Sequence, residues 1–305
     1  MGLASILASA LAWGLLACDT AHEAPVATAA PEPGGVLRVG VQAWDMPSRV
    51  EESFEPIEQA LAGALMHHGA GRSVEIVPFA IYGELLAAVT QGYVDVARME
   101  SASYLTARQR EPGITLLALE RSARGTPRQG MIITSAYASI DTLDDLRGKT
   151  FAFGDEYAAI GRYLPRAALL AAGLRAPDLG AMSFLRRGDK IAAAVRLGEF
   201  DAGVVSAETF RRVNVDGSLR VLAPLADAPR PWVARAGLER QLVGTLTAVL
   251  LDLHDAPCLR ALDAAGFAPA AQDTYEPVRA AMAAAAEFDA GNDTAAPATA
   301  QRSRP

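Results

Sequence analysis

Lysine is nearly absent from this sequence, and the chain as a whole is acidic. Only Lys149 and Lys190 occur, the other basic residues besides histidine are arginines, and the formal net charge is −7 at pH 7. A general nucleic-acid-binding protein needs a basic surface to neutralise phosphates, so this balance argues against that class. The preference for arginine over lysine is typical of a GC-rich genome and does not by itself indicate phosphate recognition.

Histidine and cysteine are also scarce, which limits metal and catalytic chemistry. None of the four histidines has the spacing of a metal site, and the adjacent His67 and His68 project in different directions from a helix. The sequence predicts neither a metal site nor a cofactor. No Ser/His/Asp or Cys/His set and no glycine-rich phosphate loop occurs at plausible positions, so an enzyme interpretation has no nucleophile or base to name.

The first eighteen residues form the longest apolar run, "MGLASILASALAWGLLAC". This run is typical of a signal peptide over residues 1–17, although it has no Lys or Arg before the apolar part. "LLAC" resembles the lipobox of bacterial lipoproteins, which predicts lipidation of Cys18 and attachment to the membrane. The alternative is a secreted protein with an incidental cysteine. If Cys18 is acylated, it cannot form a disulfide with Cys258, the only other cysteine, and the core must supply the stability.

Low-complexity segments lie next to both ends of the sequence. Residues 18–34 are rich in Pro and Ala and predict a flexible tether. Residues 292–305 are polar and rich in Ala and Pro, which predicts a disordered tail. The folded part is therefore expected between residues 35 and 291, long enough for one or two domains.

From Gly35 onward, strands and helices alternate. Predicted strands and helices follow one another up to residue 126 in the order "VLRVGVQAW", "FEPIEQALAGALMHH", "SVEIVPF", "IYGELLAAVTQG", "VDVARM", "SASYLTARQR" and "ITLLALE". A second set follows the break "RSARGTPRQG", and it ends at a turn-rich break, "DAPRPW". The chain after that break is predicted to be helical, over 238–255 and 277–288. Such alternation predicts mostly parallel sheets covered by helices on both faces.

The two sets predict an α/β fold with two lobes and a ligand cleft between them. We assign residues 35–126 and 227–291 to lobe 1, and residues 127–226 to lobe 2. Ligands bind at domain interfaces and at the carboxyl ends of strands in such sheets. The pattern alone fits a two-domain enzyme equally well.

Several motifs in sequence order resemble those of the phosphonate/phosphite-type periplasmic binding proteins. They are "YGELLAAVTQGYVDVARMESASYLTA", "SIDTLDDLRGKTFAFGDEYAAIGRYLPRAALLAAGL", "KIAAAVRLGEFDAGVVS" and "DTYEPVR". The resemblance covers residues 35–290 and implies a type II periplasmic binding fold, in which two lobes close on a ligand.

The resemblance also implies a function. It predicts a monomeric lipoprotein on the periplasmic side of the membrane that captures a phosphonate-, phosphite- or phosphate-like oxyanion or a related organic anion. Its partners would be the permease and ATPase of an ABC importer. A sensory protein that presents its ligand to a membrane receptor kinase would have the same sequence features.

The resemblance implies ligand-binding positions, but several of them depart from the family pattern. Hydroxyl side chains usual in the second-lobe turn are replaced here by Tyr157, Ala158, Ala159 and Ile160, so we expect weak phosphonate binding and a partly apolar ligand. Either Arg186 or Arg187 is a candidate for holding an anion in their place. The predicted ligand-binding residues are Tyr82, Glu100, Ser101, Tyr104, Tyr157, Ala158, Ala159, Ile160, Gly161, Arg187, Asp189 and Glu208.

Overall fold

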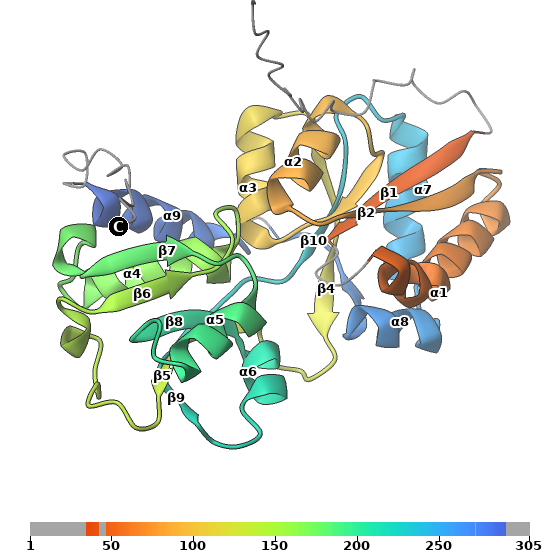
Figure 1. Ribbon diagram of the computed structural model, residues 1–305. Coiled ribbons are helices and arrows are strands. Elements are labelled where there is room, and N and C mark those ends of the chain that lie inside the picture. The colour runs from red at the N-terminus through yellow and green to blue at the C-terminus, as the bar shows by residue number, and fades with distance from the viewer. Residues whose placement is uncertain (1–34, 43–46, 272, 291–305) are drawn as a thin grey trace, which may run out of the picture.

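The protein folds into two α/β units, each built on its own sheet (Figure 1). The computed structural model describes residues 35–42, 47–271 and 273–290. The predicted signal peptide, Cys18, the tether over 18–34 and the tail over 292–305 lie outside the described residues. The α/β class and the two lobes that the sequence predicts are both present.

The first unit contains a six-stranded sheet in the order β11-β4-β10-β3-β1-β2. One face is covered by α1, α7 and α8, and the other by α2 and α3. The elements are β1 (Val36–Gln42), α1 (Pro47–His67), β2 (Ser73–Phe79), α2 (Tyr82–Gln91), β3 (Val96–Arg98), α3 (Ser101–Arg110), β4 (Thr115–Ser122), β10 (Pro231–Ala234), α7 (Arg240–Leu251), α8 (Ala256–Leu262) and β11 (Ala264–Ala268).

The second unit contains a five-stranded sheet in the order β7-β6-β8-β5-β9. Helices α5 and α6 pack on β5 and β8, while α4 contacts β9 and the C-terminal helix α9. The elements are β5 (Gln129–Ser135), η1 (Asp144–Leu146), β6 (Thr150–Phe153), η2 (Ala159–Tyr163), α4 (Leu164–Ala171), η3 (Ala176–Asp178), β7 (Ala181–Phe184), α5 (Gly188–Arg196), β8 (Ala202–Ser206), α6 (Ala207–Val213), β9 (Leu219–Ala226) and α9 (Glu276–Asp289).

Both sheets are mixed, which corrects the expectation of mostly parallel sheets. β1 pairs in parallel with β2 and β3, and β6 pairs in parallel with β7 and β8. β10, β11, β5 and β9 supply the antiparallel pairs. We predicted only helices after the second break, and this was wrong, because β10 and β11 form there and complete the first sheet.

The chain passes between the units from β4 to β5, from β9 to β10, and a third time after β11. After β11 it reaches α9, which we had grouped with lobe 1. Instead α9 packs on α4 of the second unit, where the Phe153 and Phe288 ring centroids are 6.5 Å apart and Arg166 donates a hydrogen bond to Asp289 (Figure 1). An apolar face of α9, with Val278, Ala281 and Phe288 buried, explains this docking. The exact lobe boundaries stay a prediction.

Among the described residues, no single helix is long and apolar enough to cross a membrane. Helices α7 and α8 reach that length and composition only together, and they are bent by 93° relative to each other. Their apolar residues belong to the core of the first unit.

Candidate functional site

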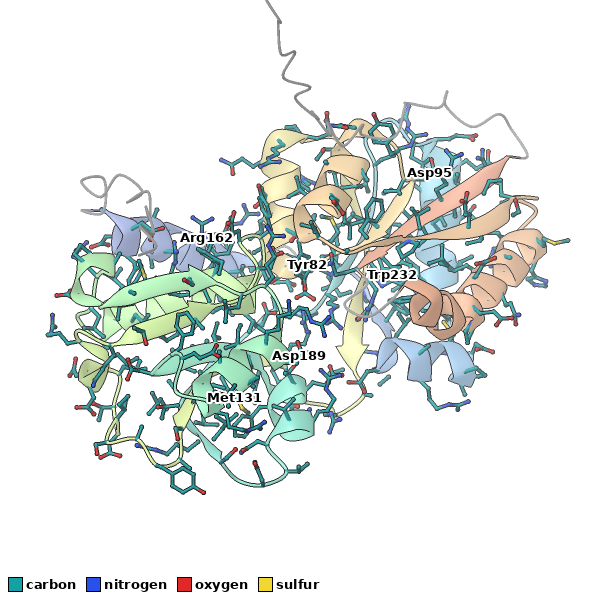
Figure 2. All side chains as sticks on the ribbon, viewed as in Figure 1. Tyr82, Asp95, Met131, Arg162, Asp189 and Trp232 are labelled. Carbon is teal, nitrogen blue, oxygen red and sulfur yellow. The ribbon has the colours of Figure 1, made fainter. Side chains whose placement is uncertain are left out.

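A cleft lies between the two units, and it consists of two connected chambers. The inner chamber has a volume of about 260 Å³ and lies between the start of α2 and the start of α5, represented by Tyr82 and Asp189 (Figure 2). The outer chamber has a volume of about 550 Å³ and lies beside the segments that cross between the units. The chambers share Arg128, Ile160, Ser206, Glu208 and Arg230, so they form one continuous cleft.

Glu100 holds both crossing segments at the first-unit side of the cleft. It precedes α3 and is 5% exposed. Arg128, on the first crossing, donates to Glu100 Oε2 at 2.5 Å, and Arg230, on the second crossing, donates to Oε1 at 2.8 Å. One buried carboxylate therefore pairs with two guanidinium groups that reach it from positions 28 and 130 residues away in the sequence.

Asp227 extends this buried network on the second crossing. Its Oδ1 accepts hydrogen bonds from the Ser101 hydroxyl at 2.7 Å and from the Ala228 amide at 2.8 Å. Its Oδ2 lies 3.3 Å from Nη1 of Arg128. Burial raises the pKa of Asp227, against the lowering effect of Arg128. Ser101 is thus bonded to the crossing segment and is itself fully buried.

The protonation of Glu100 follows from its two partners. Burial alone would raise the pKa of Glu100, but Arg128 and Arg230 outweigh that effect and lower the pKa to about 2. Burial also raises the pKa of Tyr82 well above its usual value, so its hydroxyl stays protonated at the cleft wall.

We expect the ion pairs of Glu100 to make the protein acid-sensitive. The folded-state pKa is about 2 and the ordinary value is 4.5, so the stabilisation is complete above about pH 4.5 and is lost as the pH falls toward 2. The loss would reach up to about 3 kcal/mol. Urea unfolding of wild type and Glu100→Gln between pH 6 and pH 2.5 measures it. The same acid dependence in both proteins would contradict the assignment.

The second-unit wall begins at the turn after β6, which leads into the predicted ligand-binding positions 157–161. The Tyr157 amide donates to Asp155 Oδ1 at 2.9 Å, and the turn leads into η2, a short π-helix that continues as α4. A Cβ atom at Gly161 would lie 2.6 Å from the Asp155 nitrogen, so only glycine allows this close turn. Within the described residues, the amides of Ala159 and Ile160 make no backbone hydrogen bond.

The charges on this wall come from the loop before α5 and from α6. Arg187 pairs with Asp189 through two hydrogen bonds of 3.0 and 2.6 Å, and the hydrogen bonds from Arg187 lower the pKa of Asp189. Arg186 has a φ of 64° and is exposed, and Arg212 lies on α6. Neither Arg186 nor Arg212 makes an ion pair within the part of the chain that the structure describes. Burial raises the pKa of Asp155, which lies near Arg186.

Eight of the twelve predicted ligand-binding residues line the inner chamber: Tyr82, Glu100, Ala158, Ile160, Gly161, Arg187, Asp189 and Glu208. The structure does not place the other four on its wall. Ser101 bonds to Asp227, and Tyr104 packs on Tyr275 with ring centroids 5.1 Å apart. Ala159 is fully buried, and the Tyr157 ring lies under Arg110 at 5.7 Å. These four residues support the wall from behind it.

Sequence reasoning missed four charged residues of the inner chamber: Arg128, Asp155, Arg212 and Arg230. Arg128 and Arg230 belong to the two turn-rich breaks, which we had used only as boundaries between lobes. The presence of arginines in both breaks was the signal in the sequence that could have identified these two residues. Asp155 lies two residues after the end of β6, close to the carboxyl edge of the sheet, where ligand contacts are common.

The comparisons with known proteins decide the family. The family model for the periplasmic phosphonate substrate-binding protein of ABC transporters matches residues 39–275. The chain belongs to this family. The family carries solutes to a transporter rather than converting them, so its members bind a small molecule and work with a transporter complex outside the cytoplasm. The matched region contains both crossings and the whole inner chamber.

Several solved structures share the fold of this chain. PhnD1 from Prochlorococcus marinus, in complex with methylphosphonate, has a TM-score of 0.69 at 20% identity, covering 81% of this chain and 97% of that chain. XAC2383 from Xanthomonas citri, bound to ATP, has a TM-score of 0.70 at 20% identity, covering 83% and 98%. The aliphatic sulphonate-binding protein SsuA from Escherichia coli has a TM-score of 0.56 at 19% identity, covering 83% and 78%. The predicted type II periplasmic binding fold is thereby confirmed.

The sequence predicted the capture of a small anion for an ABC transporter. The match to the family model confirms this general function. Among the described residues, no group of three or more His, Cys, Asp or Glu side chains is arranged to hold a metal ion.

Proposed function

We propose that the inner chamber binds a small organic anion through arginine side chains rather than hydroxyl groups. Five arginines and four carboxylates line the chamber, and this excess of arginine is the observation that carries the proposal. Glu100 already pairs with Arg128 and Arg230, and Asp189 with Arg187, which leaves Arg186 and Arg212 for the ligand.

The apolar residues of the chamber define the rest of the ligand. Ile160 is 8% exposed and lies where the related proteins have hydroxyl side chains, and Ile191 and Val204 line the same wall. A dianionic phosphonate head group needs a donor for nearly every oxygen lone pair, and this wall offers few. A ligand with one acidic group and an apolar portion matches it better than inorganic phosphate or methylphosphonate.

We further infer that the protein is a monomeric lipoprotein anchored through Cys18, and that it acts by binding alone. The "LLAC" motif after an apolar run supports the anchor. Membership in a family of transporter binding proteins supports the absence of a catalytic role.

Calorimetry with the purified full-length protein tests the proposed ligand class. We expect butylphosphonate to bind more tightly than methylphosphonate and inorganic phosphate. The Kd of methylphosphonate should exceed 1 μM, because helix amides and two arginines leave some oxygen lone pairs of the phosphonate without a donor. We expect Arg212→Gln to weaken butylphosphonate binding by about tenfold, as the loss of one charge-assisted hydrogen bond predicts.

Arg240→Gln is the matched control, because Arg240 is exposed and lines neither chamber. It should leave the affinity within twofold. Submicromolar binding of methylphosphonate would refute the ligand class, and equal effects of the two substitutions would refute the place of Arg212 in the site.

A further inference from the structure

The outer chamber is larger than the inner one, and its wall carries uncompensated positive charge. Its arginines are Arg121, Arg124, Arg128, Arg211 and Arg230. A volume of about 550 Å³ falls in the range of roughly 300–1,000 Å³ that is typical of ligand sites. A ligand that filled only the inner chamber would leave this space to solvent.

The ion pairs divide these arginines into two groups. Arg128 and Arg230 are bound to Glu100, and the nearby Glu120 is bound to Arg98. Across the described residues, Arg121, Arg124 and Arg211 make no ion pair, and Arg121 only donates to the Ala265 carbonyl at 3.4 Å.

Only two carboxylates of the chamber wall remain without an arginine partner among the described residues, Asp263 and Glu208. The three unpaired arginines come from β4, from the turn after it and from α6, so they approach the chamber from both units. Like charges around a concave surface focus the potential and raise the local concentration of anions.

Helix α6 connects the charges of the two chambers. Glu208 lies one turn before both Arg211 and Arg212 on this helix, so it neighbours each of them, while the two consecutive arginines point in different directions. Arg212 lines the inner chamber, Arg211 lines the outer chamber, and Glu208 lines both. An anionic group at each end of one ligand would therefore meet an unpaired arginine of α6 in each chamber.

We propose that the outer chamber is a second anion subsite, and that the ligand is an elongated molecule with an acidic group at each end and an apolar middle. This inference rests on the proposed function, because the first acidic group occupies the inner chamber. The apolar middle would pass Ile160, which lines both chambers. Linking two binding groups in one molecule raises affinity without any new contact, because the second group binds at a high effective concentration.

Two matched series of ligands test the second subsite. Linear alkylphosphonates of four, six and eight carbons carry one acidic group, and the corresponding α,ω-bisphosphonates carry two. We expect at least one bisphosphonate to bind the full-length protein about tenfold more tightly than the alkylphosphonate of the same length at low ionic strength. Exposed ion pairs are individually weak and are screened by salt, so the gain should be moderate and should shrink in 0.5 M NaCl.

Two double variants separate the subsite from the general charge of the protein. Arg124→Gln with Arg211→Gln should abolish the preference for the bisphosphonate and leave alkylphosphonate affinity within twofold. Arg72→Gln with Arg240→Gln removes the same charge at two arginines that line neither chamber, and it should keep the preference.

The outcomes distinguish this inference from the proposed function. If the alkylphosphonates bind and no bisphosphonate is preferred, or if both double variants reduce the preference equally, the second subsite is refuted and the inner site stands. If neither series binds, both proposals are refuted.

Discussion

Replacing Glu100 by alanine should reduce the free energy of unfolding by about 3–5 kcal/mol, the cost of leaving buried charges without a partner. Arg128 and Arg230 would both lose the carboxylate that neutralises them, while Arg128 would keep Asp227 at 3.3 Å. Burial of the unpaired guanidinium groups drives the loss, because desolvation of a charge is not compensated. Urea unfolding followed by circular dichroism at pH 7 measures it.

Glu208→Ala provides the control for this prediction. Glu208 lines the same cleft but is exposed, so its removal should change the free energy of unfolding by less than about 0.5 kcal/mol. If both variants lose similar stability, Glu100 does not organise the crossing segments as its contacts indicate. Tighter or unchanged ligand binding by Glu100→Ala would count against the view that these crossings shape the cleft.

Trp232→Ala should be comparably destabilising, by about 3–5 kcal/mol, because a large side chain leaves a cavity in the core. Trp232 lies on β10 in the middle of the first sheet, is 1% exposed and packs on Phe267 with ring centroids 5.8 Å apart (Figure 2). Its Nε1 also donates to Glu120 Oε1 at 2.7 Å. The alanine variant thus loses apolar contacts and a hydrogen bond to a buried carboxylate. Thermal and urea unfolding measure the change.

Two further substitutions make the Trp232 experiment specific. Trp232→Phe keeps most of the volume and removes the indole N–H, so it should cost about 1.5–3 kcal/mol, as expected for a hydrogen bond to a charged group. Tyr137→Ala removes a side chain that is 87% exposed and should have little effect. If Trp232→Ala is no more destabilising than Tyr137→Ala, β10 does not occupy the central position described above.

The sequence alone predicted most of the secondary structure, because hydrophobic periodicity is a local property. The helix predicted over "SASYLTARQR" has the observed bounds of α3, and the predicted strand "SVEIVPF" corresponds to β2. The order of motifs also predicted the family and the two-lobed fold, since these depend on spacing along the chain. Periodicity and motif order can both be read along the chain without knowing which distant residues come into contact.

Tertiary structure decided the elements whose local preferences are weak. β10 has four residues and begins with proline, and β11 reads "AAGFA", which has little β propensity. Both are strands because β4 offers each of them an antiparallel edge. The same reasoning applies to the position of α9. Its apolar face shows that it packs on the protein, but only the structure shows that it packs on α4 of the second unit.

The electrostatics of the cleft could not be predicted from the sequence, for a related reason. Glu100 was a candidate ligand contact on its own, and only the folded structure brings Arg128 and Arg230 to its two oxygens. The sequence determined which charges the chain carries. The tertiary structure determined which of these charges pair with each other, and therefore which arginines, such as Arg211 and Arg212, make no ion pair among the described residues. Ion pairing depends on distances of a few ångströms, and spacing along the chain does not specify them.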